Sequence, residues 1–204
     1  MADLRACWIF LVFSSLYIGL AWVVSGPDAW WVVDFVDGQN VFAGDDAYRF
    51  FLSRSAWVNP DLYSYNFVLP GQLLLDGVVI WLVNGDIFLA RCIHALLGAG
   101  GLALIYLCGR ELALSRAVLI AAIIMMGLLP RYALMSLSFY GEAWLGFLVI
   151  LAVYLLLRRH FLWLAVVTSW LPLVRPEGIF FLIPAGVYLL KERRFREIVL
   201  LLLP

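Results

Sequence analysis

The sequence is poor in charge: Asp, Glu, Lys and Arg make up 14% of its 204 residues, and the formal net charge at pH 7 is zero. A zero total gives no indication of a nucleic-acid partner, and we expect none. Cysteine and histidine are also scarce, with three Cys and two His, and their positions show no metal-ligand spacing. The cysteines lie within or at the edge of apolar runs, where packing is a more common role than disulfide formation. The number and the positions of the Cys and His residues argue against a disulfide framework and a Cys/His metal site.

Hydrophobic residues, in contrast, make up 65% of the chain, and the mean hydropathy is +0.99. These values lie far outside the range of soluble proteins and predict an integral membrane protein. The first apolar run, residues 6–25, has no charge and has about the 20 residues that a helix needs to cross a hydrocarbon core of ~30 Å. It is longer than the core of a secretory signal and lacks a clear A-x-A cleavage site, so we interpret it as a retained anchor.

Further apolar runs predict helices at 67–83, 87–108, 117–129, 143–157, 161–174, 179–190 and from 198 onward. Pro70, Gly71 and Asp76 interrupt the first of these, which we interpret as a juxtamembrane or half-inserted element. The fold class expected is therefore all-α: a polytopic transmembrane bundle forming a single domain over 1–204, with a first outer loop at 26–66. Because the sequence stops within an apolar run that has just begun, we expect the domain to be incomplete at its C-terminus.

With these spans the loops alternate between two sides, and most of the basic residues fall on the side of the N-terminus. These are Arg5, Arg110, Arg116, Arg158, Arg159, Lys191, Arg193, Arg194 and Arg196. The positive-inside rule then predicts a cytoplasmic N-terminus. The acidic residues lie mainly on the other side, and acidic residues contribute little to topology. Function on the outer face is one explanation of that bias.

The stretch GDDAYRFF in the first outer loop places Asp45 and Asp46 next to each other. The segment DDAYRFFLSRSAWV, residues 45–58, is predicted to be helical. The two aspartates then have an ordinary interpretation as an acidic helix start that complements the dipole and pairs with Arg49. The functional alternative is that two neighbouring carboxylates repel each other, which raises one pKa toward that of a useful base. The many aromatic residues of the loop are typical of an interfacial belt.

Two further acidic or basic features lie on the same predicted side. Glu142, in SFYGEAW, is at the outer mouth of a span, one residue too late for a capping box with Ser138 but placed to complement a helix dipole. Pro176 and Glu177, in LVRPEGIFF, describe an ordinary helix start. Arg175, just before them, either reaches toward head-group phosphates or holds a phosphate in a site.

Together these stretches resemble the GT-C superfamily of membrane glycosyltransferases, which includes protein mannosyltransferases, the lipid A aminoarabinose transferase and arabinofuranosyltransferases. The resemblance rests on the order of GDDAYRFF, WVNP, NFVLPGQLLLDGVVIWL, LARCIHALLGAGGLALIYLCGREL, SFYGEAW and RPEG, and covers nearly the whole chain. The superfamily usually has several more spans and often a soluble C-terminal domain, which are not present here.

The resemblance implies inverting transfer of a sugar from a polyprenyl-phosphate carrier to a glycan, lipid or protein acceptor on the outer, periplasmic face of a bacterial inner membrane. It implies Asp45 as the general base, Asp46 as a group that positions the base or the acceptor, and Glu142 as a second acid near the site. Arg175 would bind the carrier phosphate, and Tyr48, Arg49 and Glu177 are the other expected substrate-binding residues. No cofactor is expected to be required, although a divalent Mg or Mn ion is compatible with two acids from different loops.

Two other classes fit parts of the sequence. A transporter or flippase would place ionisable residues at mid-membrane depth, and only Asp76 and Arg91 are ambiguous in this respect. A noncatalytic membrane scaffold or assembly subunit fits the short chain and the ordinary interpretations above. Release of sugar from a labelled lipid carrier distinguishes the transferase from both.

Overall fold

A computed structural model of the chain describes residues 3–25, 33–36, 39–42, 45–64 and 68–203, with their side chains except at 33–36, 39–42, 45 and 47. The described part is helical apart from one small hairpin. The longer helices are α1 (Leu4–Ser25), α2 (Asp45–Ala56), α3 (Pro70–Leu82), α4 (Ile87–Glu111), α5 (Arg116–Gly127), α7 (Gly141–Leu157), α8 (Phe161–Val174) and α9 (Ile179–Lys191). The shorter elements are η1 (Pro60–Ser64), α6 (Pro130–Met135), η2 (Pro176–Gly178) and α10 (Phe195–Leu201). Strands β1 (Val33–Val36) and β2 (Gln39–Phe42) pair in antiparallel fashion.

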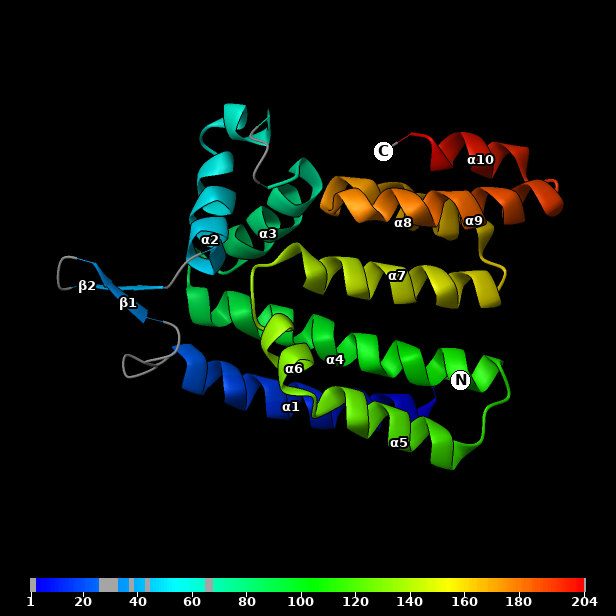
Figure 1. Cartoon of the computed structure of the whole chain (residues 1–204), viewed down its shortest axis with the longest axis horizontal. Coiled ribbons are helices and arrows are strands. Elements are labelled where there is room, and N and C mark those ends of the chain that lie inside the picture. Colours follow the sequence, from blue (N-terminus) through cyan, green and yellow to red (C-terminus); the bar gives the residue numbers. More distant parts are fainter. Residues whose placement is uncertain (1–2, 26–32, 37–38, 43–44, 65–67, 204) are drawn as a thin grey trace.

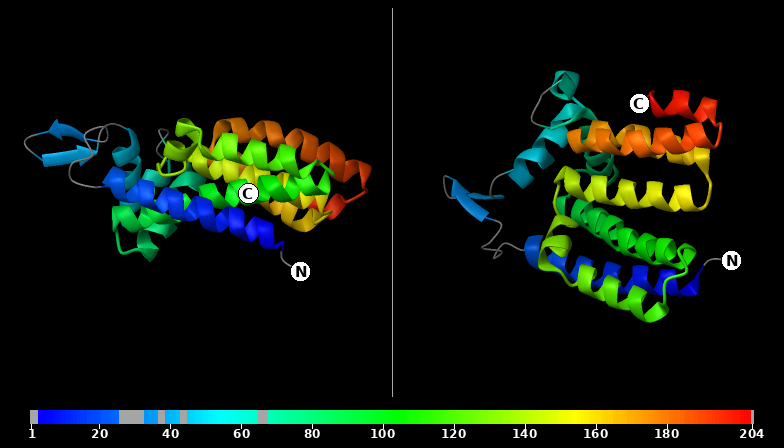
Figure 2. Two further views of the ribbon diagram at one scale, coloured as in Figure 1. Left: turned by 90° about the horizontal axis from the view of Figure 1, so that it is seen from below. Right: turned by 45° about the vertical axis from the view of Figure 1, so that its right-hand side comes forward.

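Helices α1, α4, α5, α7, α8 and α9 run along one common axis (Figure 1). Helix α1 packs against α4, α4 against α7, α7 against α8, and α8 against α9 and α10. Helix α5 packs against α4 beside α1, and the α2–α3 pair packs at one end of the bundle. Both views in Figure 2 keep the β1–β2 hairpin beyond that same end. The charged and polar segments are therefore collected at the two ends of an apolar bundle.

The two ends differ in what they carry, and we name them accordingly. The basic end consists of residues 3–5, 110–116, 158–160 and 191–196. The site end consists of the hairpin, α2, η1, α3, α6, the residues 136–142 and η2. Successive connections along the bundle alternate between these two ends (Figure 1), as the spacing of the apolar runs predicts.

Local sequence explains where the helices begin and how the chain reverses. Asp86 caps α4 by accepting a 2.9 Å hydrogen bond from the Leu89 N–H, and Ser115 caps α5 in the same way with the Val118 N–H. Arg159, in the turn after α7, takes a left-handed φ of 56°. Such a residue stops the helix and turns the chain back on itself. The tight turns place consecutive helices side by side and antiparallel.

Three apolar cores hold the bundle together. The first lies between α1, α4 and α5, where the small residues Ala21, Ala95 and Ala99 are fully buried and let the helices approach closely. The Tyr17 hydroxyl in this core donates a 2.9 Å hydrogen bond to the Gly127 carbonyl at the end of α5. The second core surrounds Phe139 beneath the site end. The third core is shared by α7, α8, α9 and α10.

Within the described residues, two helices are long and apolar enough to cross a membrane, α1 with 22 residues and α4 with 25. At a rise of ~1.5 Å per residue they are about 33 and 38 Å long, against ~30 Å for a hydrocarbon core. Helices α3, α5, α7 and α8 are apolar but shorter. The prediction of an all-helical architecture is thus confirmed in outline, whereas the crossing of a membrane and the number of helices that cross it stay predictions.

The positions of the helices agree with those predicted from the apolar runs, and DDAYRFFLSRSAWV is helical over Asp45–Ala56. Two features differ. The first outer loop contains the β1–β2 hairpin, and after α5 a short helix that the apolar runs did not predict, α6, begins at Pro130. Proline favours the first position of a helix and cannot continue the one before it.

Candidate functional site

The candidate site lies at the site end, where α2 packs against α3 and the chain between α6 and α7 passes beside them (Figure 1). Asp46, in the first turn of α2, is its central carboxylate. Its Oδ2 accepts a 2.9 Å hydrogen bond from Arg91 Nη2 of α4, and its Oδ1 accepts a 2.6 Å hydrogen bond from the Phe139 N–H. The Asp46 side chain is 15% exposed and that of Arg91 only 1%. A buried guanidinium requires such a partner, so the pair fixes α2 to α4 and to the 136–140 segment.

Arg91 also reaches the end of α1. Its Nη1 lies 3.2 Å from the Ser25 hydroxyl and 3.5 Å from the Val24 carbonyl. Arginine is suited to such a junction because its planar group offers five donors in fixed directions. The sequence left this residue ambiguous; the structure places it directly against Asp46.

The peptide group of Phe139 is held from both sides. While Asp46 accepts from its N–H, its carbonyl accepts a 2.6 Å hydrogen bond from Gln72 Nε2 of α3. Gln72 Oε1 in turn accepts a 3.1 Å hydrogen bond from Arg49 Nη1 of α2. The Arg49 guanidinium also lies over the Tyr140 ring, 5.3 Å from its centroid. The position of the Asp46 carboxylate therefore depends on side chains from three helices.

A second polar group lies deeper, between α3, α4 and α7. Asp76 Oδ1 accepts a 2.6 Å hydrogen bond from Trp144 Nε1, and Asp76 Oδ2 lies 3.4 Å from Gln72 Nε2. His94 Nε2 is 3.1 Å from Asp76 Oδ1, and both side chains are 0% exposed. The His94 ring packs edge-on against Phe139 and Trp144. Gln72 thus connects this buried group to the peptide that positions Asp46.

Arg175, at the end of α8, forms a third group with two acids. Its Nε and Nη2 donate 3.1 Å hydrogen bonds to the two oxygens of Glu177, and its Nη1 forms an ion pair with Glu142. The hydrogen bonds from Arg175 hold the pKa of Glu177 below its ordinary value, and the same bonds, with the nearby Glu142 charge, raise the pKa of Arg175. All three side chains are partly exposed, so their charges remain accessible to a ligand.

Gly141 lies between the Asp46 and Arg175 groups. A Cβ atom on this residue would lie 2.8 Å from Gln72 Oε1, 3.1 Å from Arg175 Cγ and 3.2 Å from the Val174 carbonyl oxygen. Only glycine leaves room for α7 to begin at this point. This close packing shows that the Asp46 group and the Arg175 group both lie next to Gly141 at the beginning of α7.

A cavity of about 620 Å³ opens beside Asp46 and Arg91. Its other walls come mainly from apolar residues of α1 and α6, including Leu20, Val24 and Leu134, with Tyr140 at the polar side. Pockets of this size with apolar walls and a few fixed polar groups are typical of small-molecule sites. The cavity suits a ligand with a long apolar portion and a polar end.

The sequence-predicted residues fall into these groups as follows. Asp46 and Arg49 belong to the first group, and Glu142, Arg175 and Glu177 form the third. Tyr48 lies on the exposed side of α2. Asp45 begins α2, but its side chain lies outside the described residues, so its predicted role as base stays a prediction. The pairing of Arg49 with the aspartates of α2 stays a prediction. The structure shows a contact of Arg49 with Gln72 of α3, which sequence spacing does not indicate.

The remaining members of the site were not predicted as functional residues: Gln72, Asp76, Arg91, His94 and Trp144. The interpretation of His94 as an ordinary buried residue agrees with its burial but misses its contact with Asp76. A usable indication was present, because Gln72 and Asp76 are four residues apart and Arg91 and His94 three, which places each pair on one face of an apolar helix.

Among the residues whose side chains the structure describes, no cluster of three or more His, Cys, Asp or Glu could hold a metal ion. The Arg91 and Arg175 guanidiniums occupy the places next to Asp46 and Glu142 where a cation would bind. A divalent ion at the site stays a prediction, and no step below depends on one.

Comparison of the chain with protein-family models, with curated proteins and with solved structures found no match. The resemblance to GT-C glycosyltransferases consequently rests on the motifs of the sequence, and the geometry above stands independently of it.

Proposed function

We propose that the chain is a polytopic membrane glycosyltransferase that moves a sugar from a polyprenyl-phosphate carrier to an acceptor at the site end. The basic end would face the cytoplasm, since Lys and Arg are enriched there, and the site end would face the periplasm of a bacterial inner membrane. The acceptor would be a glycan, a lipid or a protein.

The observation that carries the proposal is the position of Asp46 at the polar side of a cavity whose other walls are mainly apolar. A lipid carrier matches this arrangement of apolar and polar parts, because its long apolar chain ends in a phosphate and a sugar. Asp46 is fixed by Arg91 and by a backbone N–H before any ligand arrives, and such preorganisation is what a transfer reaction requires.

In this mechanism the carboxylate of Asp45 removes the proton of an acceptor hydroxyl as the hydroxyl oxygen attacks the anomeric carbon. The bond between that carbon and the phosphate oxygen breaks, and polyprenyl phosphate leaves with the bonding electron pair. Attack from the face opposite the phosphate inverts the anomeric carbon. Asp46 would orient Asp45 or the acceptor through the contacts described above.

Arg175 would stabilise the leaving phosphate. In the ligand-free arrangement its guanidinium is paired with Glu142 and Glu177, so a phosphate must replace at least one of them. Glu142 is the candidate for replacement, because its carboxylate meets a single nitrogen whereas Glu177 is held by two. Released Glu142 would then be a free acid beside the site.

The test is transfer of labelled sugar from a polyprenyl-phosphate donor in membranes that contain the chain. Asp45→Asn is expected to lower transfer at least about a hundredfold, the usual contribution of a general base. Asp61→Asn is the matched control, since Asp61 is an exposed carboxylate of η1 in the same loop. Full activity of Asp45→Asn would overturn the assignment of the base.

Transport is the second candidate, and the buried Asp76–His94 contact favours it, because ionisable groups inside helices often mark a substrate or proton path. His94 is the eighth residue of α4, so it lies about 10 Å from the helix end and not at mid-membrane depth. A transporter would move the intact labelled carrier across the bilayer and release no sugar.

A further inference from the structure

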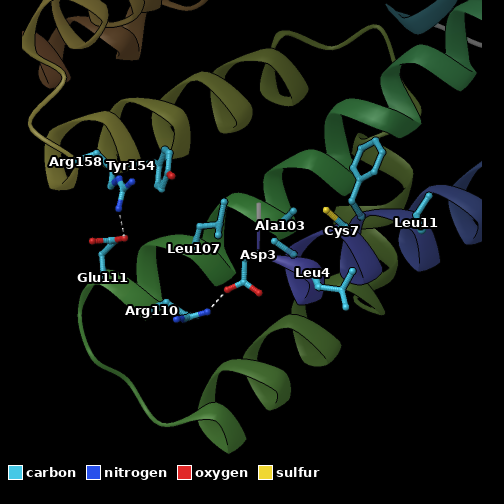
Figure 3. A pocket seen from close by; sticks show the side chains of 12 residues that line it. Asp3, Leu4, Cys7, Leu11, Ala103, Leu107, Arg110, Glu111, Tyr154 and Arg158 are labelled. Atoms are coloured by element: carbon cyan, nitrogen blue, oxygen red, sulfur yellow. Dashed lines mark hydrogen bonds and ion pairs between the residues drawn. The ribbon is translucent and has the colours of Figure 1, made fainter. Parts of the chain in front are cut away.

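A second cavity, of about 1030 Å³, lies at the basic end, far from Asp46 along the bundle. It is a groove between the beginning of α1 and the ends of α4 and α7 (Figure 3). None of the proposed transfer residues lines it. A ligand bound in this groove would therefore be separate from the donor and the acceptor of the proposed transfer.

The floor of the groove is apolar. Leu4, Cys7 and Leu11 line it from α1, and Ala103 and Leu107 line it from α4. Ala103 and Arg110 are seven residues apart on one helix, which makes the groove about 10 Å long from its apolar floor to its charged rim. That length accommodates the first part of an acyl chain lying along the helices.

Two ion pairs form the rim, and both use adjacent residues of α4. Arg110 pairs with Asp3, just before α1, and Glu111 pairs with Arg158, just after α7, at 3.0 Å. Figure 3 shows both pairs on one side of the groove, with Leu107 and Ala103 beside them. Each guanidinium uses one terminal nitrogen in its pair and is about half exposed. The rim thus offers further donors and acceptors to a ligand without changing the fold.

The two positive and two negative charges of the rim indicate which kind of lipid headgroup would bind there. The two arginines and two carboxylates of the rim sum to zero, so the rim itself, unlike the basic end as a whole, gives no net attraction for an anion such as free phosphate or an acidic lipid. A zwitterionic headgroup matches it better, because a phosphate and an ammonium can each find an opposite charge. A primary ammonium with three donors is favoured over a quaternary one, which has no donor to offer the carboxylates.

We propose that this groove binds a phosphatidylethanolamine molecule. Its phosphate lies against Arg110 and Arg158, its ammonium lies against Glu111 or Asp3, and one acyl chain runs over Leu107 and Ala103. The proposal requires that the bundle lies in a membrane but does not require the transfer reaction, so the two can fail separately.

The test is native mass spectrometry of the purified full chain in detergent micelles titrated with phosphatidylethanolamine, phosphatidylcholine or phosphatidylglycerol. We expect one phosphatidylethanolamine per chain at concentrations where the other two lipids leave the chain mostly unbound. The double variant Arg110→Gln/Arg158→Gln should weaken binding by about tenfold or more. Arg116→Gln, an exposed arginine of the same end that does not line the groove, should leave it unchanged.

A second variant, Leu107→Trp, tests the proposal if the variant Arg110→Gln/Arg158→Gln does not fold. Leu107→Trp retains all four rim charges and fills the apolar floor, so it should also weaken binding of the lipid. Equal binding of the three lipids, a preference for phosphatidylglycerol, or unchanged binding in the folded variants would each overturn the proposal.

Discussion

The two ends of the bundle use the same kinds of ion pair in opposite surroundings. At the basic end, Glu111 and Arg158 meet at 3.0 Å with both side chains well exposed. At the site end, Asp46 and Arg91 meet at 2.9 Å, with the guanidinium almost wholly buried. Water can replace either partner of the Glu111–Arg158 pair but not the buried guanidinium of the Asp46–Arg91 pair. The first arrangement can exchange partners with a ligand, and the second fixes a geometry.

The burial of the Asp46–Arg91 pair also indicates what role its charges have in the protein. Desolvation of a buried ion pair offsets most of the attraction between its charges, so apolar residues would often stabilise a protein as well or better. The buried charges of the site end are thus poorly explained as a source of stability. Their effect is to hold the Phe139 peptide and the Asp46 carboxylate in place, as a site would need.

The largest effect is expected from Asp76, because three polar groups depend on it. Asp76→Ala would leave Trp144 Nε1 and His94 without their buried partner and should lower the free energy of unfolding by about 3–5 kcal/mol. Unfolding by SDS in mixed micelles measures this change. Asp86→Ala, which removes only the cap of α4, should cost about 1 kcal/mol in the same measurement. Equal losses in the two variants would contradict the contrast between buried and exposed acids.

A double-mutant cycle tests the Asp46–Arg91 pair itself. Arg91→Met and Asp46→Asn should each destabilise the protein, and the double variant should lose less than the sum, with a coupling of about 1–3 kcal/mol. The same cycle on Glu111→Gln and Arg158→Gln should give a coupling below about 1 kcal/mol. Similar coupling energies for the two pairs would contradict the proposed difference between the buried pair and the exposed pair.

A smaller effect is expected at Gly141, which separates the Asp46 and Arg175 groups. Gly141→Ala adds a Cβ at 2.8 Å from Gln72 Oε1, so the Gln72 amide, which the Phe139 carbonyl and Arg49 hold, must shift, at a cost of about 1–3 kcal/mol. Gly146→Ala is the control in the same helix, since a Cβ there meets nothing within 4 Å. A stabilising Gly141→Ala would show that the site end is loosely packed.

The exposed rim of the site end should respond to pH in a defined direction. Because Arg175 lowers the pKa of Glu177, the contribution of this pair is present above the ordinary carboxyl pKa and is lost as pH falls through the lower folded value. Carbon NMR titration of the Glu177 carboxyl should report the lowered pKa, and Arg175→Gln should return it toward the ordinary range. A pKa that does not change in this variant would assign the shift to another group.

The sequence predicted the apolar helices of the bundle better than it predicted the structure of the site end. The apolar helices were predictable because length and hydropathy alone indicate them, as for α1 and α4. The hairpin was not, although Asp37-Gly38 between VDFV and QNVF is a common hairpin pattern, because the loop was interpreted through its aromatic residues.

Asp46, Glu142 and Glu177 were expected at the site from the sequence, but Asp76 and the side chain that pairs with Asp46 were not. Which side chain meets Asp46 depends on how α4 is rotated against α2, and no local pattern determines that. The contact of Arg91 with Asp46, and of Gln72 with the Phe139 carbonyl, required the packed structure.

The central claim is that the site end breaks the bond between a sugar and a lipid phosphate. Its most direct measurement follows a doubly labelled polyprenyl-phosphate sugar in sealed vesicles that contain the chain and an acceptor extract. Our account predicts that the sugar label leaves the lipid label in vesicles with the wild-type chain and remains attached in vesicles with Asp45→Asn. Intact donor crossing the bilayer without separation of the two labels would contradict it and identify a transporter.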